Sequence, residues 1–191
     1  MVTSSSARQN AISRARQALA NKPLYLDTET TGLESKDEIV EISIIDDDGI
    51  TLMDKLVCPS QPIPPEATRI HGIKNEDVKG AVRWPILWQT IRPILAGRLI
   101  VMYNADFDVR MMKQSSTKLG FRWDKNFEAF DLLKVYAEFR SEWDPKRQSY
   151  RYFSLDAAGK QAQIALPNAH RATADTLLTR ALLHHISEAQ A

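Results

Sequence analysis

The sequence predicts an α/β domain with a mixed sheet of five strands flanked by helices, and three observations support this fold class. Strand-like segments follow one another at residues 24–29, 39–46 and 50–57, with the turn signal Asp-Asp-Gly before the last. Helical and strand-like segments then alternate over the second half of the chain. The chain has 191 residues, of which 43% are hydrophobic, and this is enough to fill a single core.

The first half of the chain predicts a helix and then an antiparallel meander of three strands. We treat residues 1–22 as a helical extension of a domain at residues 23–191, because apolar residues recur in the extension at helical spacing. They are Ala11, Ile12, Ala15, Ala18 and Leu19. After the meander, residues 59–67 predict a proline-rich loop, since proline lacks the N–H that a central strand donates.

The second half predicts two further strands, each placed between helices, which completes a mixed sheet with helices on its faces. The expected elements are a helix at 84–96, a strand at 99–104, a helix from about Phe107, a strand at 127–132 and a helix to about Phe139. Residues 141–152 predict a basic and aromatic loop that could guide a single nucleic-acid strand. Two helices follow, one capped by Ser154 and one from about Arg171 to Glu188.

The composition argues against a duplex-DNA-binding protein, a disulfide-bonded protein and a membrane-spanning protein. Lys and Arg number 25 against 24 Asp and Glu, so the chain lacks the overall basic charge that holds long duplex DNA, and any nucleic-acid contact must be local. The single Cys58 cannot form an internal disulfide, and no apolar run reaches the ~18 residues of a membrane span. We therefore expect a soluble, cytoplasmic protein.

Two acidic residues interrupt the first strand. Asp27 and Glu29 are two positions apart, so a strand places both side chains on one face of the sheet. The flanking Leu24 and Leu26 indicate a central strand, where carboxylates are unexpected. The Asp-x-Glu pattern alone is weak, because a chain of this composition contains such a pair by chance.

Two more acids break helical apolar patterns. Asp108 shares a helix face with Met111 and Met112, whereas Asp106 suits an exposed position in the first turn. Asp175 lies three residues before Leu178 on the core side of the last helix. A buried carboxylate needs a cation or a network of donors, so these acids predict a site that holds a charged ligand.

His170 precedes Asp175 by five residues, and the two side chains converge only if His170 lies at or before the start of the helix. The four carboxylates Asp27, Glu29, Asp108 and Asp175, together with this histidine, predict a metal site. Oxygen ligands suit Mg²⁺ or Mn²⁺, whereas zinc would usually recruit more His or Cys.

These residues fall in motifs that resemble a known family. The segments DTETTGL (27–33), NADFD (104–108) and HRATAD (170–175) resemble, in order, the three motifs of the DEDDh 3′→5′ exonucleases, and PEATRIHGI (65–73) is similar to a loop in the epsilon proofreading subunit of bacterial DNA polymerase III. The resemblance implies a ribonuclease-H-like fold and stepwise release of 5′-nucleotides by two-metal hydrolysis. It implies that Asp27, Glu29, Asp108 and Asp175 hold two Mg²⁺ or Mn²⁺ ions, with His170 as general base.

The same resemblance implies contacts to the substrate. Glu66 would meet the terminal 3′ hydroxyl, Ile70 and His71 would border the last base, Leu33 would wedge beside it, and the backbone of Thr30 would touch the nucleotide. Core packing for Leu33 and a backbone hydrogen bond for His71 are the alternatives. The expected substrate is a single-stranded or frayed DNA 3′ end.

Two alternative functions and one kind of protein partner stay open. An RNA 3′-end trimmer would use the same metal site, because that site acts on the phosphodiester and not on the sugar. A catalytically silent nucleic-acid-binding module is the alternative from another class. A polymerase or another replication or repair protein is the partner that the resemblance implies, although we expect no long C-terminal extension of the kind by which the epsilon subunit attaches.

Overall fold

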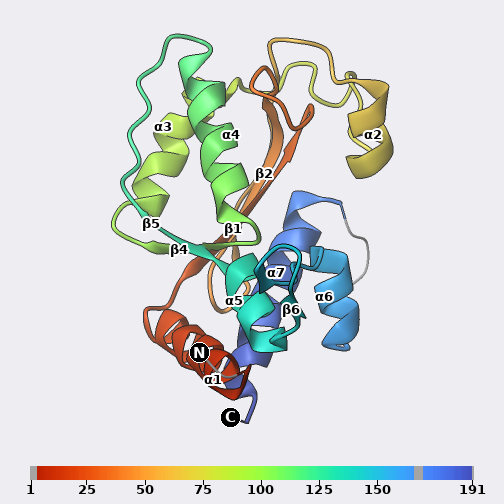
Figure 1. Ribbon diagram of the computed structural model, residues 1–191. Coiled ribbons are helices and arrows are strands. Elements are labelled where there is room, and N and C mark those ends of the chain that lie inside the picture. Colours follow the sequence, from red (N-terminus) through yellow and green to blue (C-terminus); the bar gives the residue numbers. More distant parts are fainter. Residues whose placement is uncertain (1–3, 166–169, 191) are drawn as a thin grey trace.

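Figure 1 shows the computed structural model, which describes residues 4–165 and 170–190. Its elements are α1 (Ser4–Ala20), β1 (Leu24–Thr30), β2 (Ile39–Ile45), β3 (Thr51–Leu56), α2 (Pro65–His71), α3 (Trp84–Leu95), β4 (Leu99–Met102), α4 (Ala105–Thr117), β5 (Glu128–Asp131), α5 (Leu132–Arg140), β6 (Trp143–Asp144), β7 (Ser149–Tyr150), α6 (Leu155–Gln161) and α7 (Ala172–Glu188). No helix within these ranges is long and apolar enough to cross a membrane.

The main sheet has five strands in the order β3-β2-β1-β4-β5. The pairs β1–β2 and β2–β3 are antiparallel, whereas β1–β4 and β4–β5 are parallel. The predicted meander and the two added parallel strands are therefore confirmed. Strand β1 lies in the middle, and its carboxyl end shares an edge of the sheet with the carboxyl ends of β4 and β5.

Helices cover both faces of this sheet, as Figure 1 shows. Leu24 and Leu26 of β1 belong to a core cluster that includes residues of α3 and α4. Tyr25 points to the opposite face, in a second cluster with residues of α1, α5 and α7. Because side chains alternate along a strand, Asp27 and Glu29 continue the face of Tyr25 and point toward α7.

Helix α1 packs against α5 and α7 at the lower end of the view in Figure 1. Its apolar stripe is buried there, as the helical spacing predicted. Arg14 on its partly buried side forms an ion pair of 3.0 Å with Glu138 of α5. The first predicted helix thus shares a hydrophobic cluster with the rest of the molecule.

The prediction of a loop through residues 59–67 is wrong at its end, because α2 begins at Pro65. Proline is tolerated in the first turn of a helix, where its missing N–H would have no helical partner. Gly72 ends the helix with a left-handed φ of 75°. Ala67 of α2 packs with Val40 and Ile63 in a third cluster, which brings the helix beside the sheet.

The predicted loop at 141–152 contains a short hairpin of β6 and β7. The Asp144 carboxylate accepts a hydrogen bond of 2.9 Å from the N–H of Lys146, which forms the turn. The Trp143 ring meets the Tyr150 ring edge-on at 5.5 Å. Two-residue strands fall below the length that alternation can reveal, so sequence patterns missed this hairpin.

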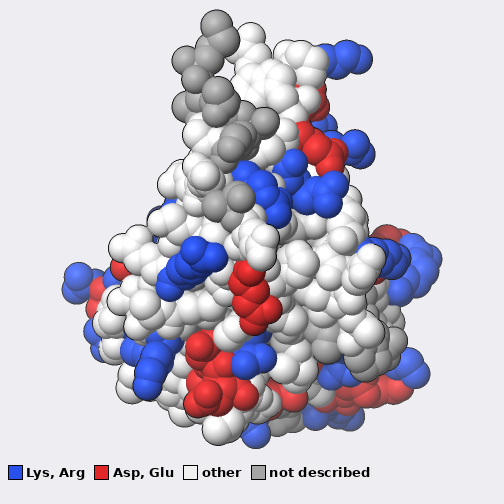
Figure 2. All heavy atoms as spheres, turned by 90° about the horizontal axis from the view of Figure 1, so that it is seen from below, with Lys and Arg blue, Asp and Glu red and all other residues white. Residues whose placement is uncertain are grey.

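Charges are dispersed over the face of the molecule drawn in Figure 2, which is the lower end in the view of Figure 1. Figure 2, which views the molecule from below, shows Lys and Arg in separate groups with Asp and Glu between them. This arrangement agrees with the near balance of 25 basic and 24 acidic side chains. On this face, dispersed charge does not form a basic track for duplex DNA.

Candidate active site

Three carboxylates meet where β1 faces α7. Asp27 and Glu29 come from β1, and Asp175 comes from the first turn of α7. Each offers an oxygen atom, and these three oxygens lie within 4.8 Å of one another. The alternation of β1 and the packing of α7 on β1 and β2 create this cluster.

Asp108, the fourth predicted ligand, is not among the three carboxylates whose oxygens lie within 4.8 Å, but its charge acts on Asp27. A left-handed Asn104, with φ 72°, turns the chain from β4 into α4 and places Asp108 in the first turn of that helix. Asp108 is 2% exposed, and its Oδ1 accepts a hydrogen bond of 2.7 Å from the Thr28 hydroxyl. Asp106 is exposed and forms an ion pair of 2.8 Å with Lys134. The expected burial of Asp108 and exposure of Asp106 are confirmed.

Burial raises the pKa of each of the four carboxylates. Burial, and then the charges of Asp108 and Glu29, raises the pKa of Asp27 well above its usual range. Burial, and then the charge of Asp175, raises the pKa of Glu29 to about 8. Burial also raises the pKa of Asp108 to about 7. Such shifts mean that the ionised cluster is costly without a cation.

His170 lies just outside α7, as its spacing to Asp175 required. Its backbone φ is 71°, and its N–H donates to Asp175 Oδ2 at 3.3 Å. The residue is exposed, so its imidazole borders solvent next to the carboxylates. Residues 166–169, which precede it, lie outside the described part of the chain.

A pocket of about 380 Å³ opens beside the carboxylates. Its lining includes all five residues for which the motifs implied substrate contact, namely Thr30, Leu33, Glu66, Ile70 and His71. Glu29 also lines it, so the pocket and the carboxylate cluster are continuous. Phe107 completes one wall, and sequence reasoning missed it although it stands between the two acids of NADFD.

The pocket residues differ in exposure. Leu33 and Ile70 are 74% and 60% exposed, so core packing does not account for Leu33. Glu66 is exposed and forms an ion pair of 3.2 Å with Arg69. Two apolar side chains and a carboxylate thus stand at the rim, where a ligand could cover them.

His71 is buried in the pocket wall, and its ring has a defined tautomer. Nδ1 accepts a hydrogen bond of 3.0 Å from the N–H of Ile73, which leaves the proton of the neutral ring on Nε2. Burial lowers the pKa of His71, so the neutral form is favoured. Nε2 is buried and makes no hydrogen bond of regular geometry within the described residues, although the nearby Thr30 backbone partly opposes the lowering of the His71 pKa. The backbone-bonded alternative for His71 thus holds at Nδ1, and Nε2 is left as a donor.

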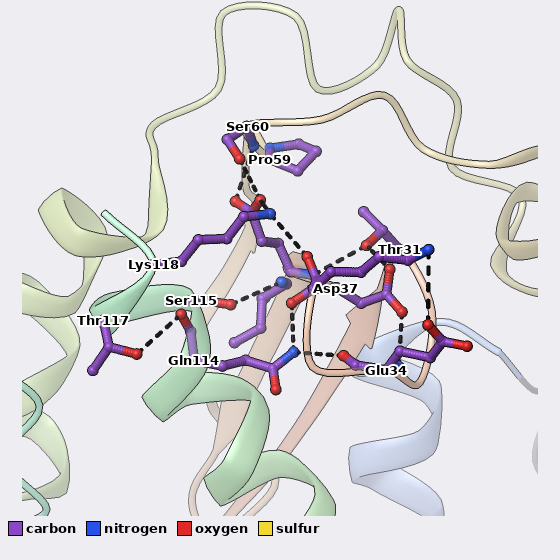
Figure 3. A network of polar contacts seen from close by, with 12 residues as sticks. Thr31, Glu34, Asp37, Pro59, Ser60, Gln114, Ser115, Thr117 and Lys118 are labelled. Carbon is purple, nitrogen blue, oxygen red and sulfur yellow. Dashed lines mark hydrogen bonds and ion pairs between the residues drawn. The ribbon is translucent and has the colours of Figure 1, made fainter. Parts of the chain in front are cut away.

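The loop that carries Leu33 is held against α4, as Figure 3 shows. Gln114 donates to the carbonyl oxygens of Glu34 and Asp37 at 2.9 and 2.6 Å. Arg110, one turn earlier, donates to the Leu33 carbonyl at 3.2 Å. The backbone around this exposed leucine is therefore fixed from the same helix that carries Asp108.

Inside the loop, Asp37 organises the turn after β1 (Figure 3). Its carboxylate accepts from the Thr31 hydroxyl at 3.0 Å and from the Glu34 N–H at 2.8 Å. Gly32 lies so close that an added Cβ would meet Asp37 Oδ2 at 2.5 Å. Any side chain at this glycine of the first motif would therefore have to displace the Asp37 carboxylate.

Glu41 and Arg171 are a feature of the site that sequence reasoning missed. Glu41 is 2% exposed on β2, and Arg171 of the third motif pairs with it. A signal was present, because Glu41 is the one charged residue in the otherwise apolar or small run IVEISII at 39–45.

Comparison with known proteins agrees with this geometry. Residues 24–183 match the family model described as "RNase_T: Exonuclease". The "Uncharacterized exonuclease CP81" of Escherichia phage 186 is 36% identical over 182 residues, which cover 92% of this chain and 93% of that protein. The DNA polymerase III subunit epsilon of Rickettsia typhi is 27% identical over 158 residues, covering 78% of this chain and 69% of its own.

A solved structure shares the fold. The structure of exonuclease X in complex with 5′ overhanging duplex DNA has a TM-score of 0.64 and 28% sequence identity, and the match covers 85% of this chain and 89% of that one. The family match spans most of the chain, and the phage relative covers nearly all of it. The chain therefore belongs to the RNase_T family and is an exonuclease of the RNase T/DEDD type.

Proposed function

We propose that the protein is a metal-dependent 3′→5′ exonuclease that releases 5′-nucleotides from single-stranded or frayed DNA 3′ ends. The observation that carries the proposal is the meeting of Asp27, Glu29 and Asp175 within 4.8 Å at the edge of a pocket. The complex of exonuclease X with 5′ overhanging duplex DNA supports DNA as the substrate class.

The donor set fits hard divalent cations. Asp27, Glu29, Asp108 and Asp175 present only carboxylate oxygens, which Mg²⁺ and Mn²⁺ prefer, and burial raises the pKa of all four, so their ionised forms are costly without a cation. When bound, two such ions would orient the phosphodiester, activate a water and stabilise the leaving 3′ oxygen. Thr28 would hold the Asp108 carboxylate in place through its hydrogen bond.

His170 is the proposed general base. Imidazole is the usual protein group for taking a proton near neutral pH, and this one is exposed beside Asp175. The hydrogen bond from the His170 N–H to Asp175 ties the base to the carboxylate cluster. The proton of the attacking water would pass to the imidazole.

The pocket would hold the terminal nucleotide. Glu66 would accept a hydrogen bond from the 3′ hydroxyl, and Ile70 and His71 would border the base. Leu33 would stack beside the base as an exposed apolar side chain, a contact that tolerates any base. The apolar rim favours an unpaired base, because a paired base would keep its partner strand in the way.

The test uses 5′-labelled DNA and RNA strands of one sequence, with Mn²⁺ or with EDTA. We expect a Mn²⁺-dependent ladder that shortens from the 3′ end, and faster cleavage of DNA. Asp108→Asn should lower the rate by more than about 100-fold, because even outer partners of metal ligands are worth roughly 10–100-fold. Asp106→Asn is the matched control, since Asp106 is exposed and points away to Lys134.

Other results of this cleavage assay would support one of the alternative functions. Faster cleavage of RNA would make the protein an RNA 3′-end trimmer. Absence of cleavage on both strands by a folded protein, with retained strand binding, would favour the silent binding module and contradict the proposal. Equal loss with both variants would contradict the assignment of Asp108.

A further inference from the structure

Glu41 is a buried carboxylate next to the proposed metal ligands. It lies on β2 directly opposite Glu29 of β1, so the two side chains share the face of the sheet that α7 covers. Its exposed fraction is 2%. A carboxylate buried in this way persists only with a close partner for its charge and its lone pairs.

Those partners come from the start of α7. Arg171 donates through Nε to both Glu41 oxygens, at 3.0 and 3.1 Å, and through Nη2 to Oε1. The N–H of Ala172 donates to Oε2 at 2.9 Å. The N-cap position of α7 makes no side-chain cap hydrogen bond of its own, so Glu41, 131 residues away in the chain, supplies an acceptor to the first turn.

This contact fixes the segment that carries the remaining functional groups. His170 immediately precedes Arg171, and Asp175 follows in the first turn of the same helix. The Asp175 N–H donates to the Arg171 carbonyl at 3.0 Å, which links the guanidinium-bearing residue to the carboxylate-bearing one. A forked guanidinium sets orientation as well as distance, which an ammonium does not.

The contact also balances charge. Glu41 faces Glu29 across the strand pair, and Asp175 lies on the helix above them. The Arg171 cation, paired with Glu41, offsets part of the negative charge that Glu41 adds beside Glu29.

We propose that Glu41 and Arg171 form a positioning pair, which sets His170 and Asp175 against Asp27 and Glu29 and thereby controls turnover without touching the substrate. The inference rests on the proposed exonuclease function. In this proposal Arg171 orients the start of α7 through its forked hydrogen bonds as well as through its charge. Glu41 is the fixed acceptor on β2 to which these bonds are made.

The experiment compares Arg171→Lys and Glu41→Gln with wild type in kcat and KM on a 5′-labelled DNA strand at saturating Mn²⁺. Arg14→Lys is the matched control, because Arg14 forms an Arg–Glu pair between α1 and α5 outside the site. We expect Arg171→Lys and Glu41→Gln to lower kcat by about 10- to 100-fold, as loss of outer-shell partners does. KM should stay within about twofold, since the pocket residues are unchanged.

A second readout separates positioning from folding. The thermal shift on adding Mn²⁺ should persist in Glu41→Gln, because the four proposed ligands remain, and the circular dichroism spectrum should match that of wild type. The double variant should lose no more kcat than the worse single variant, because the two residues act as a unit. Arg14→Lys should keep its kcat.

Each failure is recognisable. An active wild type whose folded Arg171→Lys and Glu41→Gln variants keep kcat would overturn the positioning pair alone, as would equal loss in Arg14→Lys. A kcat loss that merely follows the unfolded fraction would also overturn it. A wild type without Mn²⁺-dependent cleavage would overturn the proposed function, and this inference with it.

Discussion

Gly32 shows how a single residue sets the rim of the pocket. The close approach of Asp37 leaves no room for a Cβ, so Gly32→Ala should push the Asp37 carboxylate away from the Thr31 hydroxyl and the Glu34 N–H. We expect a loss of about 1–3 kcal/mol in the free energy of unfolding, the usual cost of forcing atoms into a packed site. We also expect a higher KM for DNA, because the neighbouring Leu33 would shift.

Urea unfolding and steady-state kinetics would measure both effects. Ser35→Ala is the control, because Ser35 is an exposed residue in the same loop. Unchanged stability and unchanged KM in Gly32→Ala would show that the loop adapts easily, and that its contacts to α4 do not hold Leu33 in place.

At this scale, sequence spacing was informative wherever a polar residue broke a clear apolar period. The positions of Met111 and Met112 identified Asp108 as the buried acid and Asp106 as the exposed one. Glu41 also interrupts an apolar run, but its pairing with Arg171, which lies 130 residues away in the chain, could not be predicted from that signal. A long-range ion pair leaves no local periodicity, so only the structure reveals it.

Among the elements, α1 offers a clear stability test. Ile12 is 2% exposed and packs with residues of α5 and α7. Ile12→Ala should lower the free energy of unfolding by about 2–5 kcal/mol, because it removes buried methyl groups and leaves a cavity. The exposed Gln9 provides the control, and Gln9→Ala should change stability by less than about 0.5 kcal/mol.

Denaturant unfolding of the two variants checks this expectation. A small effect of Ile12→Ala would mean that α1 is an appendage that detaches without disturbing the sheet. The division between an extension at residues 1–22 and a domain at 23–191 stays a prediction that this measurement addresses.

Elements long enough to repeat their apolar pattern several times could be predicted from the sequence, whereas short elements could not. The strands and the longer helices carry enough repeats to reveal their faces. Helix α2 begins inside a proline-rich segment. Proline has no backbone N–H, but the first turn of a helix does not need one, so prolines there do not exclude a helix. The β6–β7 hairpin depends on the side-chain turn at Asp144 and on the contact of Trp143 with Tyr150.

At the scale of the whole molecule, stability should depend on pH through the carboxylate cluster. The pKa of Glu29 rises from 4.5 to about 8 on folding, and that of Asp108 from 3.8 to about 7. A group whose pKa is raised by folding stabilises the protein below its unfolded pKa, and this contribution is lost as pH rises through the folded pKa. In EDTA, the melting temperature should therefore fall between about pH 5 and 8.

Thermal melts in EDTA and in Mn²⁺ measure this dependence. Each pKa unit corresponds to about 1.4 kcal/mol, so the slope should be visible, and Glu29→Gln should flatten it because one titrating group is gone. Mn²⁺ should raise the melting temperature more at pH 8 than at pH 5, since it binds the ionised cluster. Equal slopes for wild type and Glu29→Gln in EDTA would contradict the electrostatic account.

The overall topology was largely predictable because each local pattern agreed with the global fold. The meander, the two parallel strands and the helical layers followed from periodicity and element order. The distances between Asp27, Glu29 and Asp175 could not follow, because they depend on how α7 packs over β1 and β2.

The packing of α7 has a consequence for how the protein is made. The contact between Glu41 and the N–H of Ala172 joins positions 131 residues apart, so the ribosome has completed the sheet long before it makes the helix that covers the site. Sequence-distant contacts form late and slowly during folding. A nascent chain that still lacks His170 and α7 therefore carries Asp27, Glu29 and Asp108 but neither the proposed base nor Asp175, so the proposed active site is complete only after synthesis has reached α7.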